Sequence, residues 1–436
     1  MSRARRALRR LASSSFAKSS AIHLGGSVLN AMLPLLVMPI LTRLLRPEDY
    51  GIMRTGTILS NIFIVLIGLN AYGLIARTYF ERDAARLRAL LNTSLIFNFI
   101  AAGVMWIVCL IVGGWLEKVT QFPEAWLGAL VLFSLFSVLQ TVYLSFLQVR
   151  NESWKYVLMQ TLGGVVNLGL SVWLVMQFQM DWRGRMWALM ASVAVVALWG
   201  LLEMWRSWKL LAPTWSKPAC KEMAAFGIPL IPHTLGGWVM TMAAGLFLNN
   251  MATIGDTGFF SVAFNLASPI ALLIGAANRA YVPALFERLS RPDAPDLHRV
   301  CRILLAAAFA LPLLGVAWGL FCVWCLPWIV GPRFVGAAGH VFWLSMAYAS
   351  QGIYYIFGNF VIYAKRTSLM AWRADFLGGI VLLISCPLLI LWIGPVGASV
   401  ATFLGFATST IGCISAARIA HPMPWAAALK SILSKP

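Results

Sequence analysis

The stretch PILTRLLRPEDYGIMR, residues 39–54, decides the fold because it places three arginines and two acids between two long apolar runs. Charged side chains are costly inside hydrocarbon and mark the places where a membrane-spanning segment ends. The flanking runs, at about 22–43 and 51–76, are each long enough to cross roughly 30 Å of hydrocarbon as a helix. The stretch therefore predicts a turn between two membrane-spanning helices.

The composition extends this interpretation to the whole chain. Of its 436 residues, 60% are hydrophobic and 11% charged, and the mean hydropathy is +0.80, whereas soluble domains carry roughly 25% charged residues. Apolar runs recur along the chain and predict an all-α integral membrane protein of about 12 transmembrane helices in two parallel six-helix lobes around a central cationic cavity. Beyond the first two, the expected helices are 89–113, 125–147, 156–178, 186–204, 224–248, 257–286, 301–330, 339–363, 371–393 and 396–417.

The distribution of lysine and arginine predicts the orientation. Basic loops resist translocation, and most of the 34 basic residues fall in the tails and loops of one side if the N-terminus is cytoplasmic. Both termini are therefore expected in the cytoplasm. The net charge of +19 is explained by contact with an anionic membrane surface and does not require nucleic acid as a partner.

These segments predict five parts of the chain. They are a basic cytoplasmic N-terminal tail, an N-terminal lobe of helices one to six, a basic cytoplasmic linker, a C-terminal lobe of helices seven to twelve and a cytoplasmic C-terminal tail, at residues 1–20, 21–206, 207–223, 224–417 and 418–436 respectively.

The two predicted lobes share a faint internal repeat. The triplets Asp49, Tyr50, Gly51 and Asp256, Thr257, Gly258 are separated by 207 residues. Six helices separate the matched points, and an even number of crossings returns the chain to the same side. The halves are therefore expected to be parallel repeats, and transporters with such halves bind substrate between them.

Two arginines fall inside predicted helices, on equivalent faces of helices two and eight, and asparagines of these two helices and of helix one are the other candidates for substrate binding. Arg54 and Arg279 lie toward opposite ends, separated by about 27 Å of depth at 1.5 Å per residue. Such arginines either line a cavity or extend to lipid headgroups, and both interpretations remain open. The same two readings apply to Arg77 at the end of helix two. The polar candidates are Asn30, Asn61, Asn265 and Asn278.

The sequence gives little support for catalysis or metal binding. The five histidines are not spaced as metal ligands, and no phosphate-binding loop or nucleophile motif is present, so we expect no enzyme activity, no metal and no cofactor. The acids nearest the hydrocarbon are Asp375 and Glu203. Either could carry a coupling ion, or each could form an interfacial ion pair.

The opening stretch, together with an asparagine in helix one and the motif ARTYFER at 76–82, resembles the polysaccharide-biosynthesis flippases. These are the O-antigen and exopolysaccharide transporters of the superfamily that also holds multidrug exporters and the lipid II flippase. The resemblance implies that a polyprenyl-diphosphate-linked oligosaccharide moves from the cytoplasmic to the periplasmic leaflet of a bacterial inner membrane by alternating access. It also implies a monomer that works beside other glycan-assembly membrane proteins.

Three alternatives stay open. A cation-coupled multidrug exporter of the same superfamily would be expected to carry buried acids, and this chain has arginines in its spans instead. A lipid II flippase also has a cationic cavity but carries extra C-terminal helices. A membrane glycan polymerase or glycosyltransferase would need a sizeable extramembrane loop with catalytic residues, and most loops here have about ten residues.

Overall fold

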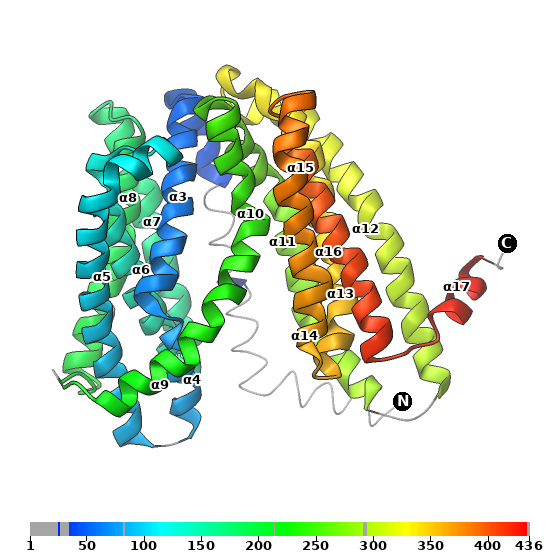
Figure 1. Ribbon diagram of the computed structural model, residues 1–436, viewed down its shortest axis with the longest axis horizontal. Helices are drawn as coiled ribbons and strands as arrows, with labels where there is room; N and C mark the ends of the chain where they lie inside the picture. The colour runs from blue at the N-terminus through cyan, green and yellow to red at the C-terminus, as the bar shows by residue number, and fades with distance from the viewer. Residues whose placement is uncertain (1–24, 27–34, 82, 213, 291–293, 434–436) are drawn as a thin grey trace. The chain divides into compact units, whose positions relative to one another are not determined.

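A computed structural model of the protein describes residues 25–26, 35–81, 83–212, 214–290 and 294–433. The described chain is helical throughout and contains no strand (Figure 1). Its labelled helices are α3 (Pro47–Gly68), α4 (Ala71–Phe80), α5 (Ala84–Thr120), η1 (Glu124–Trp126), α6 (Leu127–Val149), α7 (Ser153–Gln177), α8 (Trp182–Arg206), α9 (Lys217–Gly227), η2 (Ile228–Leu230), α10 (Ile231–Met251), α11 (Ile254–Leu289), α12 (Ala294–Ile329), η3 (Pro332–Ala337), α13 (Ala338–Tyr363), α14 (Thr367–Met370), η4 (Ala371–Phe376), α15 (Leu377–Ile393), α16 (Gly397–Ala420) and α17 (Trp425–Leu433).

Within the described residues, nine helices are long and apolar enough to cross a membrane. The multi-pass membrane protein expected from the sequence is therefore confirmed. The nine do not include α10 or α13, and of the first predicted helix the structure describes mainly the apolar segment Leu35–Leu44. The count of twelve stays a prediction.

The second predicted helix, expected to run unbroken over 51–76, is wrong in one respect. It is interrupted between α3 and α4, where Leu69 and Asn70 both adopt positive φ angles, 44° and 53°. This left-handed backbone is unfavourable for most residues other than glycine, although asparagine adopts it more readily than leucine does. Packing holds it in place: the Leu69 carbonyl oxygen lies 2.1 Å from where a Cβ of Gly227 would stand, and the Asn70 amide donates to Thr234 Oγ1 at 3.3 Å.

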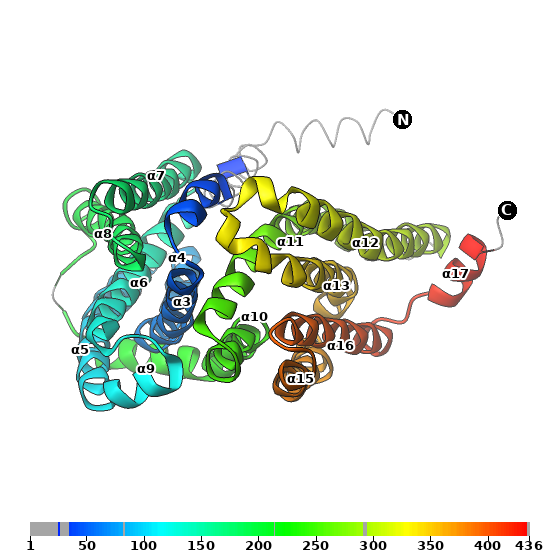
Figure 2. The same ribbon diagram turned by 90° about the horizontal axis from the view of Figure 1, so that it is seen from above.

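The described chain divides into two compact units. The first contains Ile52–Leu235 and the described residues before Arg46. In it α8 packs against α6 and α7, and α9 lies across α4 and α5 (Figures 1 and 2). Its apolar interior forms two clusters, one around Phe122 and Leu130 and one around Tyr143 and Phe146.

The second unit contains Gly236–Pro436 together with Arg46–Gly51, the residues around the start of α3. Here α16 packs between α13 and α15, while α12 contacts α13 and the short C-terminal helix α17 (Figure 2). The close approach of α15 and α16 depends on small residues: a Cβ on Gly378 would lie 2.7 Å from the Gly405 carbonyl oxygen. Small residues at helix interfaces are typical of membrane proteins, in which lipid replaces water and close packing supplies the attraction.

The internal repeat predicted from the sequence is visible in how α3 and α11 begin. They start at Pro47 and Ile254, an offset of 207. The backbone N–H of Arg46 donates to Asp49 Oδ2 at 2.8 Å, and the N–H of Thr253 donates to Asp256 Oδ2 at 3.0 Å. Acids in the first turn also complement the helix dipole. The opening stretch thus encodes a helix start that the chain repeats once.

Candidate functional site

The most exposed of the candidate cations in the membrane-spanning helices is Arg279 on α11. Its side chain lies over Gly275, one turn earlier, where Nη1 is 3.7 Å from the position of a glycine Cβ. The guanidinium also acts electrostatically on the Tyr355 hydroxyl of α13 in the same unit. Because Arg279 is exposed within its unit, it is available to an anionic ligand.

Asn278 lies beside Arg279 and is held by a second amide. The Nδ2 of Asn359, on α13, donates to Asn278 Oδ1 at 2.8 Å, and Asn359 is 4% exposed. This bond ties α11 to α13 at the level of the arginine. Asn265, three turns earlier on α11, is half-buried, and its backbone oxygen accepts from Ser268 Oγ at 2.8 Å.

Arg54 has a different environment from the one expected. It lies on α3 in the first unit, and its exposed fraction is 7%, so in this conformation it does not face an open cavity. Asn61, two turns further along, donates from Nδ2 to the Thr57 carbonyl oxygen at 2.8 Å. The amide therefore bonds its own helix, as polar residues in apolar helices commonly do.

Arg77 near the end of α4 is exposed and pairs with Glu81 at 3.3 Å. Glu81 also pairs with Arg86 at the start of α5, and Arg86 pairs in turn with Glu222 of α9. This chain of ion pairs joins the end of α4 and the start of α5 to the middle of α9, which favours an anchoring role for Arg77. The remaining candidate, Asn30, lies outside the described residues.

The two acids considered for ion coupling have different partners. Glu203 at the end of α8 pairs with Lys155 of α7 and accepts a hydrogen bond from Tyr143 at 2.7 Å. Asp375 accepts from the Tyr354 hydroxyl at 2.9 Å and lies in η4, a π-helical turn. Such turns are rare and occur frequently at functional sites. Among the described residues no three metal-ligating side chains cluster.

Arg185 is a residue that the sequence reasoning missed. It lies in the first turn of α8, where Nη1 donates to Asn167 Oδ1 at 2.7 Å and to Ser171 Oγ at 2.6 Å. Both partners belong to α7, so the first unit contains a cation held by neutral polar groups. A signal existed, because Arg185 immediately precedes the predicted sixth helix, but a basic residue there is typical of an interfacial anchor.

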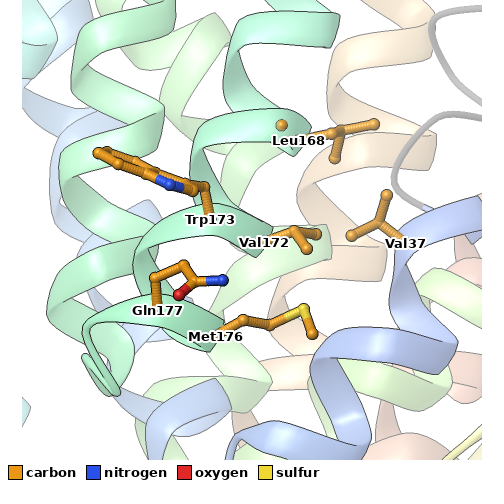
Figure 3. A pocket seen from close by; sticks show the side chains of 7 residues that line it. Val37, Leu168, Val172, Trp173, Met176 and Gln177 are labelled. Carbon is orange, nitrogen blue, oxygen red and sulfur yellow. The ribbon is translucent and has the colours of Figure 1, made fainter.

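An apolar groove lies beside α7 in the same unit. It has a volume of about 460 Å³ and is lined by Val37 of the Leu35–Leu44 helix and by α7 (Figure 3). Trp173 and Met176 are more than half exposed there, and Gln177 supplies the polar side chain labelled at its edge. The groove suits hydrocarbon and offers no grouping for catalysis.

Comparisons with known proteins agree on the family. Residues 16–288 match the polysaccharide biosynthesis protein family. An Lsg locus protein of Haemophilus influenzae is 24% identical over 364 residues, which cover 81% of this chain and 86% of that protein. A second Haemophilus influenzae protein, described as a membrane protein, is also 24% identical and covers 81% of this chain and 85% of its own length.

Solved structures share the fold. The lipid II flippase MurJ in an inward closed conformation superimposes with a TM-score of 0.73 at 11% identity, over 91% of this chain and 87% of that one. An inward-facing multidrug resistance MATE family transporter of the MOP superfamily gives 0.70 at 16% identity, over 92% and 96%. The family match covers more than half of the chain, and the chain therefore belongs to the polysaccharide biosynthesis protein family.

Proposed function

We propose that this protein is a flippase that carries a polyprenyl-diphosphate-linked oligosaccharide from the cytoplasmic to the periplasmic leaflet of a bacterial inner membrane by alternating access. The family match and the flippase and transporter folds that it resembles support a transporter over an enzyme. With both termini cytoplasmic, α11 starts at the periplasmic side and ends at the cytoplasmic side.

The observation that carries the proposal is the exposed Arg279 in an apolar helix, beside the Asn278–Asn359 pair. A diphosphate is the fixed anion of such a lipid, and a guanidinium binds it through charge-assisted, bidentate hydrogen bonds. Amides and tyrosines nearby suit sugar hydroxyls. A multidrug exporter for cations would place acids at this position instead.

The proposed route uses cations of both units in turn. The headgroup first meets Arg279 from the cytoplasmic side, and Arg77 marks the same side as an interfacial cation. The headgroup then leaves past Arg54 near the start of α3. Because Arg54 is 7% exposed in this structure, the proposal requires that it becomes exposed in another state of the transport cycle.

Two acids, Asp375 and Glu203, are the candidates that we propose for ion coupling. Glu203 has the cation Lys155 as its partner. Asp375 accepts a bond from a neutral hydroxyl and lies in a π-helical turn. We further propose that the protein acts as a monomer beside other membrane proteins of glycan assembly.

The test measures glycan export in a host that lacks its own copy of this protein and carries the wild type or the variant Arg279→Ala or Arg279→Lys. Arg279→Ala is expected to lower export at least tenfold at unchanged protein level, because the diphosphate loses a bidentate partner, and Arg279→Lys should restore part of it. Full export by Arg279→Ala would refute the assignment. Drug resistance conferred by the wild type would point to a multidrug exporter, and rescue of peptidoglycan synthesis would point to lipid II.

A further inference from the structure

The hairpin formed by the end of α11 and the start of α12 encloses a cavity of about 220 Å³. Its walls include Leu285 and Leu304, which are 2% and 6% exposed, and Tyr281. Arg288 is the charged residue in its lining, and its side chain is exposed. The cavity is therefore apolar in its interior and carries a guanidinium at its rim.

The depth of this cavity in the membrane follows from α12. Trp324 and Trp328 are 63% and 61% exposed on that helix, and their rings contact each other at 4.4 Å between centroids. Exposed tryptophans are enriched at the membrane interface. From Trp324 back to Leu304 the helix rises about 30 Å at 1.5 Å per residue, which is the thickness of the hydrocarbon. The cavity thus lies at the opposite interface, where lipid headgroups begin.

We propose that this cavity binds one anionic phospholipid of the cytoplasmic leaflet. Its phosphate pairs with Arg288, and the first part of an acyl chain packs against Leu285 and Leu304. The depth of the cavity suits the junction of headgroup and chain, and the single guanidinium selects a lipid with net negative charge. The lining of the cavity does not include the arginines and amides assigned to the transported substrate.

Lipid binding here would stabilise a specific part of the proposed transport path. Tyr281, in the cavity lining, follows Arg279 by two residues on α11, so a lipid that fills the cavity braces the turn that bears the candidate substrate arginine. The lipid site itself does not rest on the proposed function, but its assignment to the cytoplasmic leaflet rests on the orientation proposed there, and this consequence for transport rests on the proposed function.

The experiment is a lipid titration of the purified full-length protein followed by native mass spectrometry, with phosphatidylglycerol compared with phosphatidylcholine. Three variants separate the contributions. Arg288→Gln removes the rim charge. Ala284→Phe fills the cavity from an exposed lining position without changing charge. Arg302→Gln is the matched control, because it removes a charge at the same depth of α12 from a residue outside the cavity lining.

The proposal predicts one tightly retained phosphatidylglycerol and weaker phosphatidylcholine. Arg288→Gln should weaken phosphatidylglycerol roughly fivefold, the effect of one basic residue at a charged surface, and Ala284→Phe should remove the tight binding, while Arg302→Gln leaves it in place. Equal binding of the two lipids would overturn the proposal. So would an equal loss in Arg302→Gln, or unchanged binding in Ala284→Phe, since either result would indicate a general surface attraction.

Discussion

Gly51 and Ile254 are in direct backbone contact: a Cβ on Gly51 would lie 1.9 Å from the carbonyl oxygen of Ile254. The same relation holds one repeat away, where a Cβ on Gly258 would lie 1.9 Å from the carbonyl oxygen of Pro47. Both contacts join the starts of α3 and α11 within the second unit. Each helix start therefore presents a glycine to the first residue of the other, as expected for two copies of one motif.

This reciprocal contact predicts that Gly51→Ala and Gly258→Ala each destabilise the protein. No side chain can stand so close to a carbonyl oxygen, so the helix starts must separate, at a cost of about 1–3 kcal/mol, the usual penalty of overpacking. The measurement is the apparent melting temperature in detergent, with hydrogen exchange at residues 47–58 and 254–262. Gly103→Ala on α5, which has open space around its Cβ, is the control and should be neutral or slightly stabilising. An equal effect in all three would contradict the account.

The pair formed by Lys155 and Glu203 predicts a non-additive result. The Glu203 side chain is 11% exposed and that of Lys155 is 33% exposed, so Lys155→Met leaves a largely buried carboxylate without its cation. We expect a loss of roughly 1–3 kcal/mol, less than for a fully buried pair, and partial recovery in Lys155→Met with Glu203→Gln. Arg183→Gln, which breaks the exposed pair with Asp181, should change stability little. Thermal unfolding of the wild type, Lys155→Met, Glu203→Gln, their double variant and Arg183→Gln decides, and strictly additive losses in the double variant would refute the argument.

The C-terminal helix α17 is predicted to loosen in acid. His421, in the turn before α17, stacks on Phe360 at 6.2 Å between centroids, and burial lowers the pKa of its imidazole. A histidine whose folded pKa is lowered binds fewer protons than in the unfolded state. The folded state is therefore favoured at high pH. The free energy of unfolding falls as the pH drops through the ordinary pKa near 6.5, and it levels off below the folded pKa.

Hydrogen exchange at residues 425–433 measures this effect. Exchange in α17 should accelerate between pH 7.5 and pH 5.5, after correction for the intrinsic rate, and His421→Gln should remove the pH dependence. If the variant keeps the same dependence, another group is responsible.

Arg279 and Arg77 are predicted to differ in importance. Arg279 lies on an apolar helix beside a partly buried amide pair, whereas Arg77 is paired with Glu81. Arg279→Ala should therefore reduce export far more than Arg77→Ala, whose effect we expect to be less than twofold. Export per unit of inserted protein, measured in parallel for Arg279→Ala and Arg77→Ala, tests the distinction. A larger loss of export in Arg77→Ala would contradict this assignment of roles.

The sequence predicted the repeat well because a helix start is local. The bonds from the Arg46 N–H to Asp49 and from the Thr253 N–H to Asp256 need only a few consecutive residues, and each helix start contains one. The break at Leu69 and Asn70 could not be predicted, because Leu69 adopts a left-handed backbone only with the close contact of Gly227. Thr234, the partner of Asn70, likewise lies far away in the chain.

The candidate site could be predicted only in part, because helical spacing is local and the packing of other helices is not. The helical period places Arg54 and Arg279 on equivalent faces, but it does not tell whether a face is covered by other helices. The structure buries Arg54 and exposes Arg279. Arg185 escaped notice because its partners, Asn167 and Ser171, belong to a different helix, and neither forms a recognisable motif by itself.

The central claim is that Arg279 binds the diphosphate of a lipid-linked oligosaccharide. Native mass spectra of the wild type and of Arg279→Ala, both purified from the host in which the protein is made naturally, test it most directly. The account predicts a bound species with the mass of a polyprenyl diphosphate plus sugars in the wild type and its loss in the variant. The same species retained undiminished in Arg279→Ala, or only ordinary phospholipids in both proteins, would contradict it.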